Sequence, residues 1–224
     1  MKIGILGGIG PEATGYFYIT LINKLKKSGL IKKNKDYPQF FINSINAPEL
    51  TSLEVQNSDI QLYIDGINEL TTHKPDFIVM VCNTIHIYRD LLIQKSGFNN
   101  ILSLRDIVKE ELTKASLPLC ILATPLTIKN DLYRYNEFSY INLDAGDLKE
   151  ITEIIINFNA TGDKEKNKEK LIEIIKKQTK LGAKSFLMAC TEISELLVDE
   201  NNIQKLDSLE ILLNFVLKKI SLNF

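Results

Sequence analysis

Two of the three cysteines lie at matching positions of two similar segments, and they are the residues best suited to chemistry. Residues 76–85 line up with residues 184–193, which places Cys82 opposite Cys190 at an offset of 108 residues. In each segment an apolar run, typical of a buried strand, leads directly to the cysteine. Polar residues follow at once, so each cysteine is expected at the end of a strand.

The position at a strand end favours reactivity of both thiols. A helix is expected to begin just after Cys82 and just after Cys190, and the free N–H groups of a first helical turn favour thiolate over thiol. The N–H groups of residues 83–84 and 191–192 would also suit a substrate carboxylate. The alternative is that both cysteines are small buried hydrophobic residues, as free cysteines often are. Repetition of the pattern favours the catalytic interpretation.

The remaining cysteine and the two histidines give weaker indications. Cys120 lies within the apolar run 117–122 and is expected in the core. His86 either orients a thiol or packs locally, and the sequence leaves both interpretations open. His73 is expected to be exposed in a loop. The chain has no C-x-x-C motif and no histidine cluster, so no metal site is predicted.

A glycine-rich loop follows the first apolar run. Gly8, Gly10 and Ala13 fit the dinucleotide-binding pattern G-x-G-x-x-G/A between a strand and a helix. The next expected strand, residues 40–45, is not followed by the acidic residue that would hold a ribose. The alternative, which we favour, is a loop whose backbone N–H groups bind a small carboxylate.

Short apolar runs alternate with amphipathic stretches along the whole chain, which predicts an α/β fold with parallel sheets. The expected strands are residues 3–6, 40–45, 77–81, 101–103, 117–123, 138–141 and 185–189. The expected helices are residues 11–28, 52–72, 84–95, 104–114, 125–136, 147–158, 163–181 and 207–220. A weaker second repeat pairs residues 3–8 with 119–124, so the chain is interpreted as two similar α/β halves with a site between them.

Composition excludes several classes of protein. The chain has 224 residues and a net charge of −1, which gives no basic excess for nucleic acid or a membrane surface. No apolar run reaches the ~18 residues of a membrane span. The apolar start at residues 1–6 is too short for a signal peptide, and three cysteines do not form a disulfide framework. A cytoplasmic location is therefore expected.

Three motifs together resemble the aspartate/glutamate racemase superfamily, most closely its aspartate racemase-like branch. They are Gly4–Thr14, Cys82–His86 and Cys190–Ile193, and their order and spacing agree over essentially the whole chain. The resemblance implies two α/β domains related by a pseudo-twofold axis, with the active site in the cleft between them. We expect residues 1–103 with 207–224 in the first domain and residues 104–206 in the second.

The resemblance also implies an activity, which is amino-acid racemisation in a homodimer without pyridoxal phosphate, metal or nucleotide. Cys82 and Cys190 would transfer protons on opposite faces of the substrate, one as thiolate and the other as thiol. His86 and Glu192 would support the two cysteines. Substrate contacts would come from the loops that follow the strands, at Ile9, Gly10, Asn83, Thr84, Thr124 and Thr191.

Two departures concern the side chain of the substrate. Aspartate racemases of this family tend to carry an arginine that binds the distal carboxylate, and Leu50 stands at the matching position, in Pro48–Leu50. They also tend to carry a lysine where Asn159 precedes the small residues 160–162. Aspartate or glutamate is still favoured, because Lys164 or Lys166 would be long enough to replace these charges.

Other functions fit the same motifs. One is an isomerase or decarboxylase of another small carboxylic acid, since the missing charges leave room for a different substrate. Another is a non-catalytic protein that binds small acids, although a binding protein has no need of two thiols. The third is a nucleotide-dependent enzyme that uses the glycine loop.

Overall fold

The computed structural model describes residues 1–48, 50–161 and 163–223. The chain divides into two compact units, one of residues 1–49, 54–104 and 212–224 and the other of residues 50–53 and 105–211. Every pairing between the named strands is parallel, which confirms the predicted α/β class. Among the helices of the described residues, none has the length and apolar character needed to cross a membrane.

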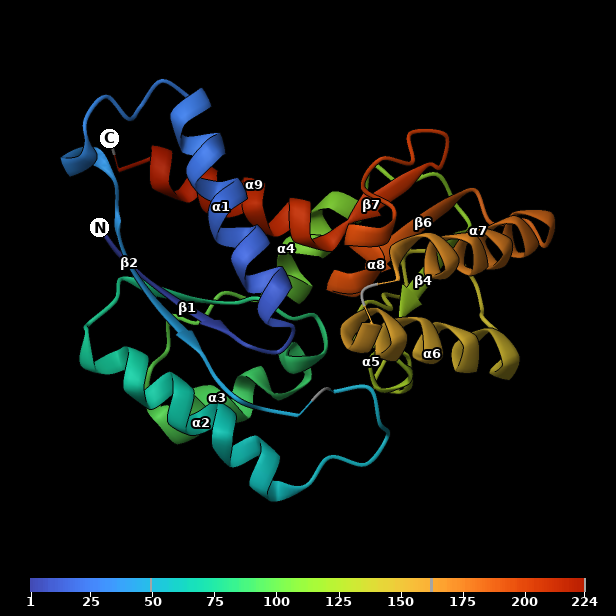
Figure 1. Ribbon diagram of the computed structural model, residues 1–224, viewed down its shortest axis with the longest axis horizontal. Coiled ribbons are helices and arrows are strands. Elements are labelled where there is room, and N and C mark those ends of the chain that lie inside the picture. Colours follow the sequence, from blue (N-terminus) through green and yellow to red (C-terminus); the bar gives the residue numbers. More distant parts are fainter. Residues whose placement is uncertain (49, 162, 224) are drawn as a thin grey trace. The chain divides into compact units, whose positions relative to one another are not determined.

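The first unit is built on a three-stranded sheet in the order β2-β1-β3 (Figure 1). Its strands are β1 (Lys2–Gly7), β2 (Gln39–Ser44) and β3 (Phe77–Met80). Ile3 and Ile5 of the central strand are fully buried, as expected of a strand that is covered on both faces. In the ribbon view α1 (Pro11–Lys27) and the C-terminal part of α9 (Ser208–Ser221) cover one face, and α2 (Asn57–Thr72) and α3 (Arg89–Ser96) cover the other.

Helix α1 starts as the sequence predicts, with Pro11 at its first position, where the missing N–H costs nothing. Its buried stripe differs from the face of Tyr18, Leu21, Ile22 and Leu25 that the i, i+3, i+4, i+7 spacing predicts. Ala13, Phe17, Leu21 and Leu25 are buried, four residues apart, so the stripe is centred on Phe17. Each step of four residues returns to the same face of the helix, and this face packs on the sheet.

The second unit contains a four-stranded sheet in the order β5-β4-β6-β7. Its strands are β4 (Leu119–Ala123), β5 (Tyr140–Ile141), β6 (Ser185–Ala189) and β7 (Lys205–Asp207). The order β5-β4-β6 repeats the order β2-β1-β3 of the first unit, which agrees with the internal repeat seen in the sequence. The helices are α4 (Leu104–Leu112), α5 (Pro125–Lys129), α6 (Ala145–Thr161), α7 (Lys164–Lys180) and α8 (Thr191–Leu196).

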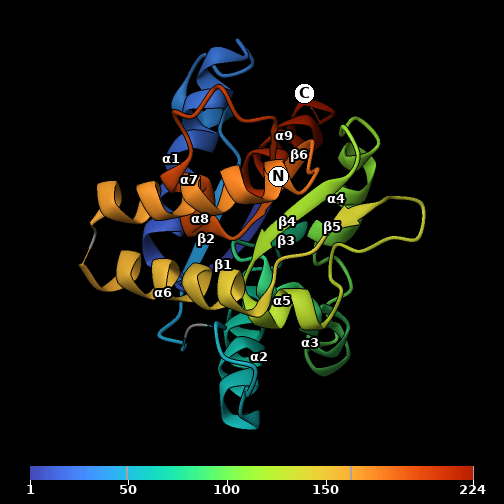
Figure 2. The same ribbon diagram turned by 90° about the vertical axis from the view of Figure 1, so that its right-hand side faces the viewer.

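Helices α6 and α7 lie side by side on one face of this sheet (Figure 2). Cys120 and Leu122 of β4 and Phe186 and Met188 of β6 form that face of the core. The alternation follows from the period of two along a strand. The side chains that pack on them from the two helices are Ile151, Ile154, Ile155, Phe158, Leu171, Ile174 and Ile175.

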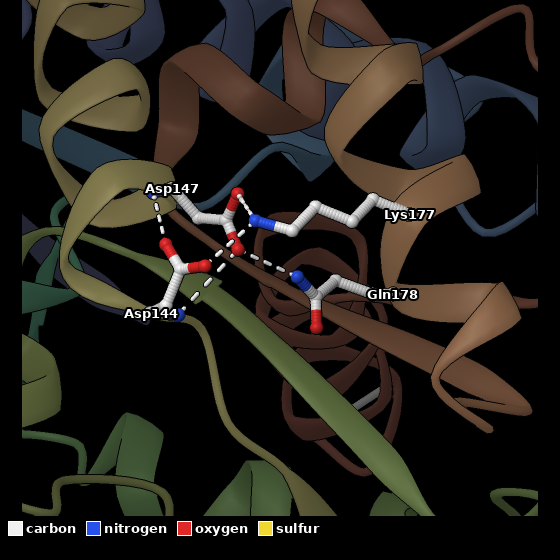
Figure 3. Close-up of polar contacts among 4 residues, drawn as sticks. All are labelled: Asp144, Asp147, Lys177 and Gln178. Atoms are coloured by element: carbon white, nitrogen blue, oxygen red, sulfur yellow. Dashed lines mark hydrogen bonds and ion pairs between the residues drawn. The ribbon is translucent and has the colours of Figure 1, made fainter.

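A polar cluster joins the start of α6 to the end of α7 (Figure 3). The Lys177 ammonium lies 2.7 Å from a carboxylate oxygen of Asp144 and 2.7 Å from one of Asp147. Gln178 Nε2 donates to the second Asp147 oxygen at 2.7 Å. The hydrogen bond from Lys177 lowers the pKa of Asp144. Asp147 is only 5% exposed, so these donors replace the water that its carboxylate gives up.

Four expected elements differ clearly from the structure. The helix expected over residues 52–72 begins only at Asn57. Residues 101–103 form no strand beyond an isolated bridge between Ile101 and Ile78. The helix expected over residues 84–95 begins as a 3₁₀ segment, η2 (Thr84–Tyr88), and only then continues as α3. The helix expected over residues 125–136 ends at Lys129, and the chain soon turns through a positive φ of 49° at Asp131. A second 3₁₀ segment, η1 (Asn34–Asp36), and the short strand β7 were not expected.

Candidate active site

Cys190 lies between the end of β6 and the start of α8. Its backbone is extended, with φ −149° and ψ 138°, and its carbonyl accepts the first bond of the helix from the Ser194 N–H at 3.1 Å. The residue is 7% exposed and belongs to the core cluster of the second unit. The expectation of a cysteine between a strand and a helix is confirmed here.

The thiol of Cys190 makes a hydrogen bond to a buried carboxylate. Its Sγ donates to Glu192 Oε2 at 2.9 Å, and the Thr191 hydroxyl donates to the same oxygen at 2.9 Å. Asn159 Nδ2, from the end of α6, donates to the other oxygen, Oε1, at 3.2 Å. Glu192 is 8% exposed. A carboxylate this buried needs donors, and three neighbouring side chains supply them.

Behind this network lies a second one that the sequence did not indicate as part of a site. Ser194 Oγ donates to the Cys190 carbonyl at 3.2 Å or to Asp207 Oδ1 at 2.8 Å. The same Asp207 oxygen accepts the N–H groups of Leu209 and Glu210, and so caps α9. Burial raises the pKa of Asp207. The available signal was the spacing of Asp207 and Glu210, which is typical of a helix start.

Cys82 stands in a different setting. It follows β3 and is partly exposed, while its neighbours Asn83 and Thr84 are 3% and 2% exposed. The segment after it is the five-residue 3₁₀ helix η2, and Asn83 at its N-cap has helical dihedrals. The expected α-helix start after Cys82 is therefore wrong. A short 3₁₀ segment aligns fewer peptide dipoles than an α-helix and gives less support to a thiolate.

His86 is 6% exposed, and both of its ring nitrogens have backbone partners. Nε2 lies 3.4 Å from the Met80 carbonyl, and the Leu104 N–H donates to Nδ1 at 3.4 Å. The second contact requires an unprotonated Nδ1, so the ring carries its proton on Nε2 and donates it to Met80. Of the two interpretations open from the sequence, these contacts favour local packing: within the first unit, His86 ties the end of β3 to Leu104.

The glycine loop after β1 is held together from within. Gly8 has a φ of 86°, and a Cβ there would lie 2.1 Å from the Ile45 carbonyl oxygen, so only glycine fits. The Thr14 hydroxyl accepts the Gly8 N–H at 3.0 Å and donates to the Gly10 carbonyl at 3.2 Å. Ile9, between the two glycines, is 5% exposed. The N–H of Gly8 is therefore used inside the protein, whereas the substrate contacts expected at Ile9 and Gly10 stay predictions.

Thr124 follows β4, the neighbour of β6 in the sheet. Its hydroxyl accepts the Thr127 N–H at 3.2 Å and donates to the Thr127 hydroxyl at 3.1 Å, which caps α5. β4 and β6 run in register to Ala123 and Ala189, so Thr124 and Cys190 leave the same edge of the sheet. The structure thus gives Thr124 a structural role and places it on the expected side for a ligand.

In the first unit, too, the predicted site residues leave the sheet at one edge. Leu6 pairs with Met80, and the Val81 N–H donates to the Leu6 carbonyl at 3.0 Å. The loop at Ile9 and the segment at Cys82 therefore leave the sheet at its carboxyl edge. Each unit brings its own predicted site residues together at one edge of one sheet, the edge at which α/β proteins bind ligands.

Of the four residues considered for a distal carboxylate, one is apolar, two have partners elsewhere and one, Lys166, is exposed. Leu50 is 4% exposed, and Asn159 binds Glu192. The Lys164 ammonium forms an ion pair with Glu195 and lies 5.5 Å from the centre of the Phe158 ring. Lys166 is exposed. Glu49 and Gly162, in the stretches that suggested these positions, lie outside the described residues.

Cys120 is buried in the core, as the sequence predicts. Its side chain is fully buried in the second unit. Burial raises the pKa of its thiol to about 12, and the negative charge of Asp147 contributes. A thiol that stays protonated at neutral pH is a poor nucleophile and a poor base, so Cys120 is suited to the core and not to proton transfer.

Comparison with known proteins gives a family. The model of the Asp/Glu/hydantoin racemase family matches residues 6–216. The broad specificity amino-acid racemase RacX of Bacillus subtilis (strain 168) is 28% identical over 133 residues, which are 59% of this chain and 58% of that protein. The match thus spans little more than half of the relative.

Solved structures share the fold over nearly the whole chain. An aspartate racemase homologue from Pyrococcus horikoshii OT3 is 24% identical with a TM-score of 0.74, covering 98% of this chain and 99% of that one. The aspartate racemase of Picrophilus torridus is 23% identical with a TM-score of 0.77, covering 98% and 94%. Glutamate racemase isoform RacE1 from Bacillus anthracis is 14% identical with a TM-score of 0.66, covering 99% and 82%.

Proposed function

Because this chain belongs to the Asp/Glu/hydantoin racemase family, we propose that it racemises an amino acid and that Cys82 and Cys190 are its two proton-transfer groups. One observation carries the proposal. The two units repeat the same strand order, and each has a cysteine just beyond the carboxyl end of the corresponding strand, β3 or β6. A repeated thiol is what a two-base reaction requires.

The chemistry sets the roles. Inverting a stereocentre by proton transfer needs a base on one face of the α-carbon and an acid on the other. A thiolate takes the α-proton, and a thiol on the opposite face donates its own proton to the resulting carbanion. The C–H bond that forms replaces the one that breaks, and the two sulfurs exchange protonation states. The mechanism therefore requires both thiols to reach one α-carbon, and it uses no cofactor.

The carbanion must be stabilised, because its charge spreads onto the α-carboxylate. Preorganised donors at that carboxylate lower the barrier. We assign this role to the loops at the carboxyl edges of the two sheets, with Ile9, Gly10, Asn83 and Thr84 from one unit. The contacts from the other unit come from Thr124 and Thr191.

The substrate is a separate question. Aspartate or glutamate, favoured from the sequence, would need a cation for the second carboxylate, and burying an unpaired charge is costly. Leu50 is apolar, Asn159 is bonded to Glu192, and Lys164 is paired with Glu195. We therefore propose that the chain also accepts amino acids with neutral side chains, as the similarity to a broad specificity racemase suggests. A homodimer is proposed on the family resemblance, and a cytoplasmic location is proposed on the cysteine usage of the chain.

The proposal is tested by incubating the protein with single enantiomers of aspartate, glutamate, asparagine, serine and alanine in deuterated water. Proton NMR then follows loss of the α-proton signal, and a chiral assay follows inversion. We expect exchange with at least one amino acid, without added metal or pyridoxal phosphate. The matched control is the Cys82→Ser/Cys190→Ser double variant, which should be inactive. Exchange in the double variant equal to that of the wild type would contradict the proposal.

A further inference from the structure

Glu192 stands out among the carboxylates of the second unit because it touches a reacting atom. Its Oε2 lies 2.9 Å from the Cys190 sulfur, and the residue is 8% exposed. In this bond the sulfur is the donor and the carboxylate oxygen is the acceptor, so the bond stabilises the thiol form of Cys190. Deprotonating Cys190 would place two negative charges at hydrogen-bond distance with little water to screen them.

The position of Glu192 is fixed from two sides. Asn159 Nδ2 donates to Oε1, and the Thr191 hydroxyl donates to Oε2. Because Asn159 comes from the end of α6, 33 residues earlier in the chain, it holds the carboxylate against a different element. The carboxylate cannot turn away from the sulfur without losing a bond to one of these donors.

The other charged side chains described near Cys190 pair with each other or bind a neighbouring hydroxyl. Lys164 of α7 is paired with Glu195 of α8, three residues beyond Glu192. Asp207 of β7 binds the hydroxyl of Ser194, on the carbonyl side of Cys190. Glu192, in contrast, is bonded to the sulfur itself, so we assign the electrostatic effect on the thiol to this carboxylate.

We propose that Glu192 holds Cys190 in the thiol form, so that Cys190 is the proton donor of the resting enzyme, and that Asn159 is a positioning residue for Glu192. The inference rests on the proposed function of Cys190. In the favoured direction the proton leaves Sγ for the α-carbon, a C–H bond forms, and a thiolate remains beside Glu192. In the opposite direction that thiolate takes the α-proton. Glu192 exchanges no proton in either direction of the proposed step.

This arrangement has a consequence for kinetics. The equilibrium constant between two enantiomers is one, so kcat/KM must be equal in the two directions. An intrinsic preference of Cys190 for the thiol form therefore makes kcat differ between the L and D enantiomers. KM differs by the same factor, so that kcat/KM is the same for both. Removing the charge of Glu192 should change that asymmetry.

The first experiment needs no substrate. In a Cys82→Ser/Cys120→Ser background, the ultraviolet absorbance of the thiolate reports the ionisation of Cys190 alone as pH is raised. With Glu192→Gln added, the midpoint should move to lower pH by about one pH unit, because a neutral amide replaces a charge at contact distance. Asn159→Leu should move it in the same direction by less. Glu195→Gln, on the same helix, is the matched control and should leave it unchanged.

Equal midpoints with and without the Glu192→Gln substitution would overturn the inference, and so would an equal shift in the Glu195→Gln control. The second experiment measures kcat and KM for both enantiomers in otherwise wild-type protein. Glu192→Gln should change the ratio of the two kcat values by about tenfold. A shift of about one pH unit in the midpoint of Cys190 changes its ratio of thiolate to thiol by that factor. An unchanged ratio contradicts the inference. Failure of the wild type to exchange any α-proton contradicts the proposed function instead, and the titration separates the two.

Discussion

Cys82 and Cys190 follow strands whose first residues, Phe77 and Ser185, are 108 positions apart, yet the chain after each cysteine is built differently. After Cys190 an α-helix starts at once, and its second residue supplies a carboxylate to the thiol. After Cys82 a 3₁₀ segment comes first, and its polar residue His86 is turned to the backbone. One sulfur is buried and hydrogen-bonded to a carboxylate, whereas the other is partly exposed.

The difference teaches that an internal repeat can preserve the strand and the cysteine while its polar surroundings diverge. The repeat keeps a thiol at each strand end, which the proposed two-base reaction needs twice. It does not keep the polar neighbours of each thiol, and under the proposed mechanism the two sulfurs have unequal tasks, one starting as acid and the other as base. Four predictions test how far this comparison goes.

The largest effect is expected from the two cysteines themselves. Cys82→Ser and Cys190→Ser should each lower kcat/KM for the best amino acid by at least ~100-fold, since each removes an acid–base group. Steady-state racemisation measured with a chiral assay gives the value. Cys120→Ser is the control and should keep kcat/KM near that of the wild type. Near-normal activity in either of the first two variants would show that the repeat does not reflect a two-base mechanism.

The next effect concerns stability on the Cys82 side. His86→Leu should lower the free energy of unfolding by about 2 kcal/mol, because it leaves the buried Met80 carbonyl and Leu104 N–H without their ring partner. Urea denaturation at neutral pH measures it. The other histidine, His73, is exposed and stacks on Phe41 at a centroid distance of 4.1 Å. We expect His73→Leu to change stability by less than about 0.5 kcal/mol, and equal losses in the two variants would contradict the assigned role.

A somewhat smaller effect is expected at the other unit, in the cluster that joins α6 to α7. Asp147→Asn should lower the free energy of unfolding by about 1–2 kcal/mol, because a neutral amide cannot accept from both Lys177 and Gln178. The same urea measurement applies. Asp144, which binds Lys177 from a more exposed position, provides the comparison through Asp144→Asn. A loss in Asp144→Asn as large as that in Asp147→Asn would argue against burial as the cause.

The smallest effect depends on pH and isolates Cys120. The native thiol keeps its proton to a pKa of about 12, whereas an unfolded thiol releases it near 9, so between these values the native state binds more protons. The free energy of unfolding therefore falls as pH rises through this window. Cys120→Ser lacks this contribution. Its stability relative to the wild type should improve by about 1 kcal/mol between pH 9 and pH 10, and a constant difference would contradict it.

Much of the fold was predictable because its signals are local. β6 was predicted end to end at Ser185–Ala189, since five apolar or small residues stand between polar ones. β7 was missed because Lys205–Asp207 has a single apolar residue, and its strand character comes from pairing with Phe186–Met188. The change from α to 3₁₀ after Cys82 was likewise not visible, because apolar spacing alone does not distinguish the two over one turn.

In the candidate site, too, local features were predicted from the sequence and contacts between distant residues were not. The cysteines and the strand ends were predicted from a repeat that anyone can align in the sequence. The bond between Asn159 and Glu192 joins residues 33 positions apart, and the contact of His86 with Leu104 joins residues 18 apart. Such contacts arise only after helices pack on a sheet. Sequence therefore indicated the two candidate cysteines and their places at strand ends, but not the neighbouring side chains that contact them.

The isolated bridge at Ile101 has a consequence for how copies of this chain can meet. β3 is an end strand of its sheet, and an end strand exposes N–H and C=O groups that another chain can pair with. Here the Ile78 N–H donates to the Asn100 carbonyl and the Leu102 N–H donates to the Ile78 carbonyl, both at 2.9 Å. Three residues thus occupy the middle of the open edge beside Cys82, where a foreign strand would otherwise add. In the first unit, growth of the sheet into a neighbouring copy would have to occur at β2, where Pro38 at the entrance has no N–H to offer.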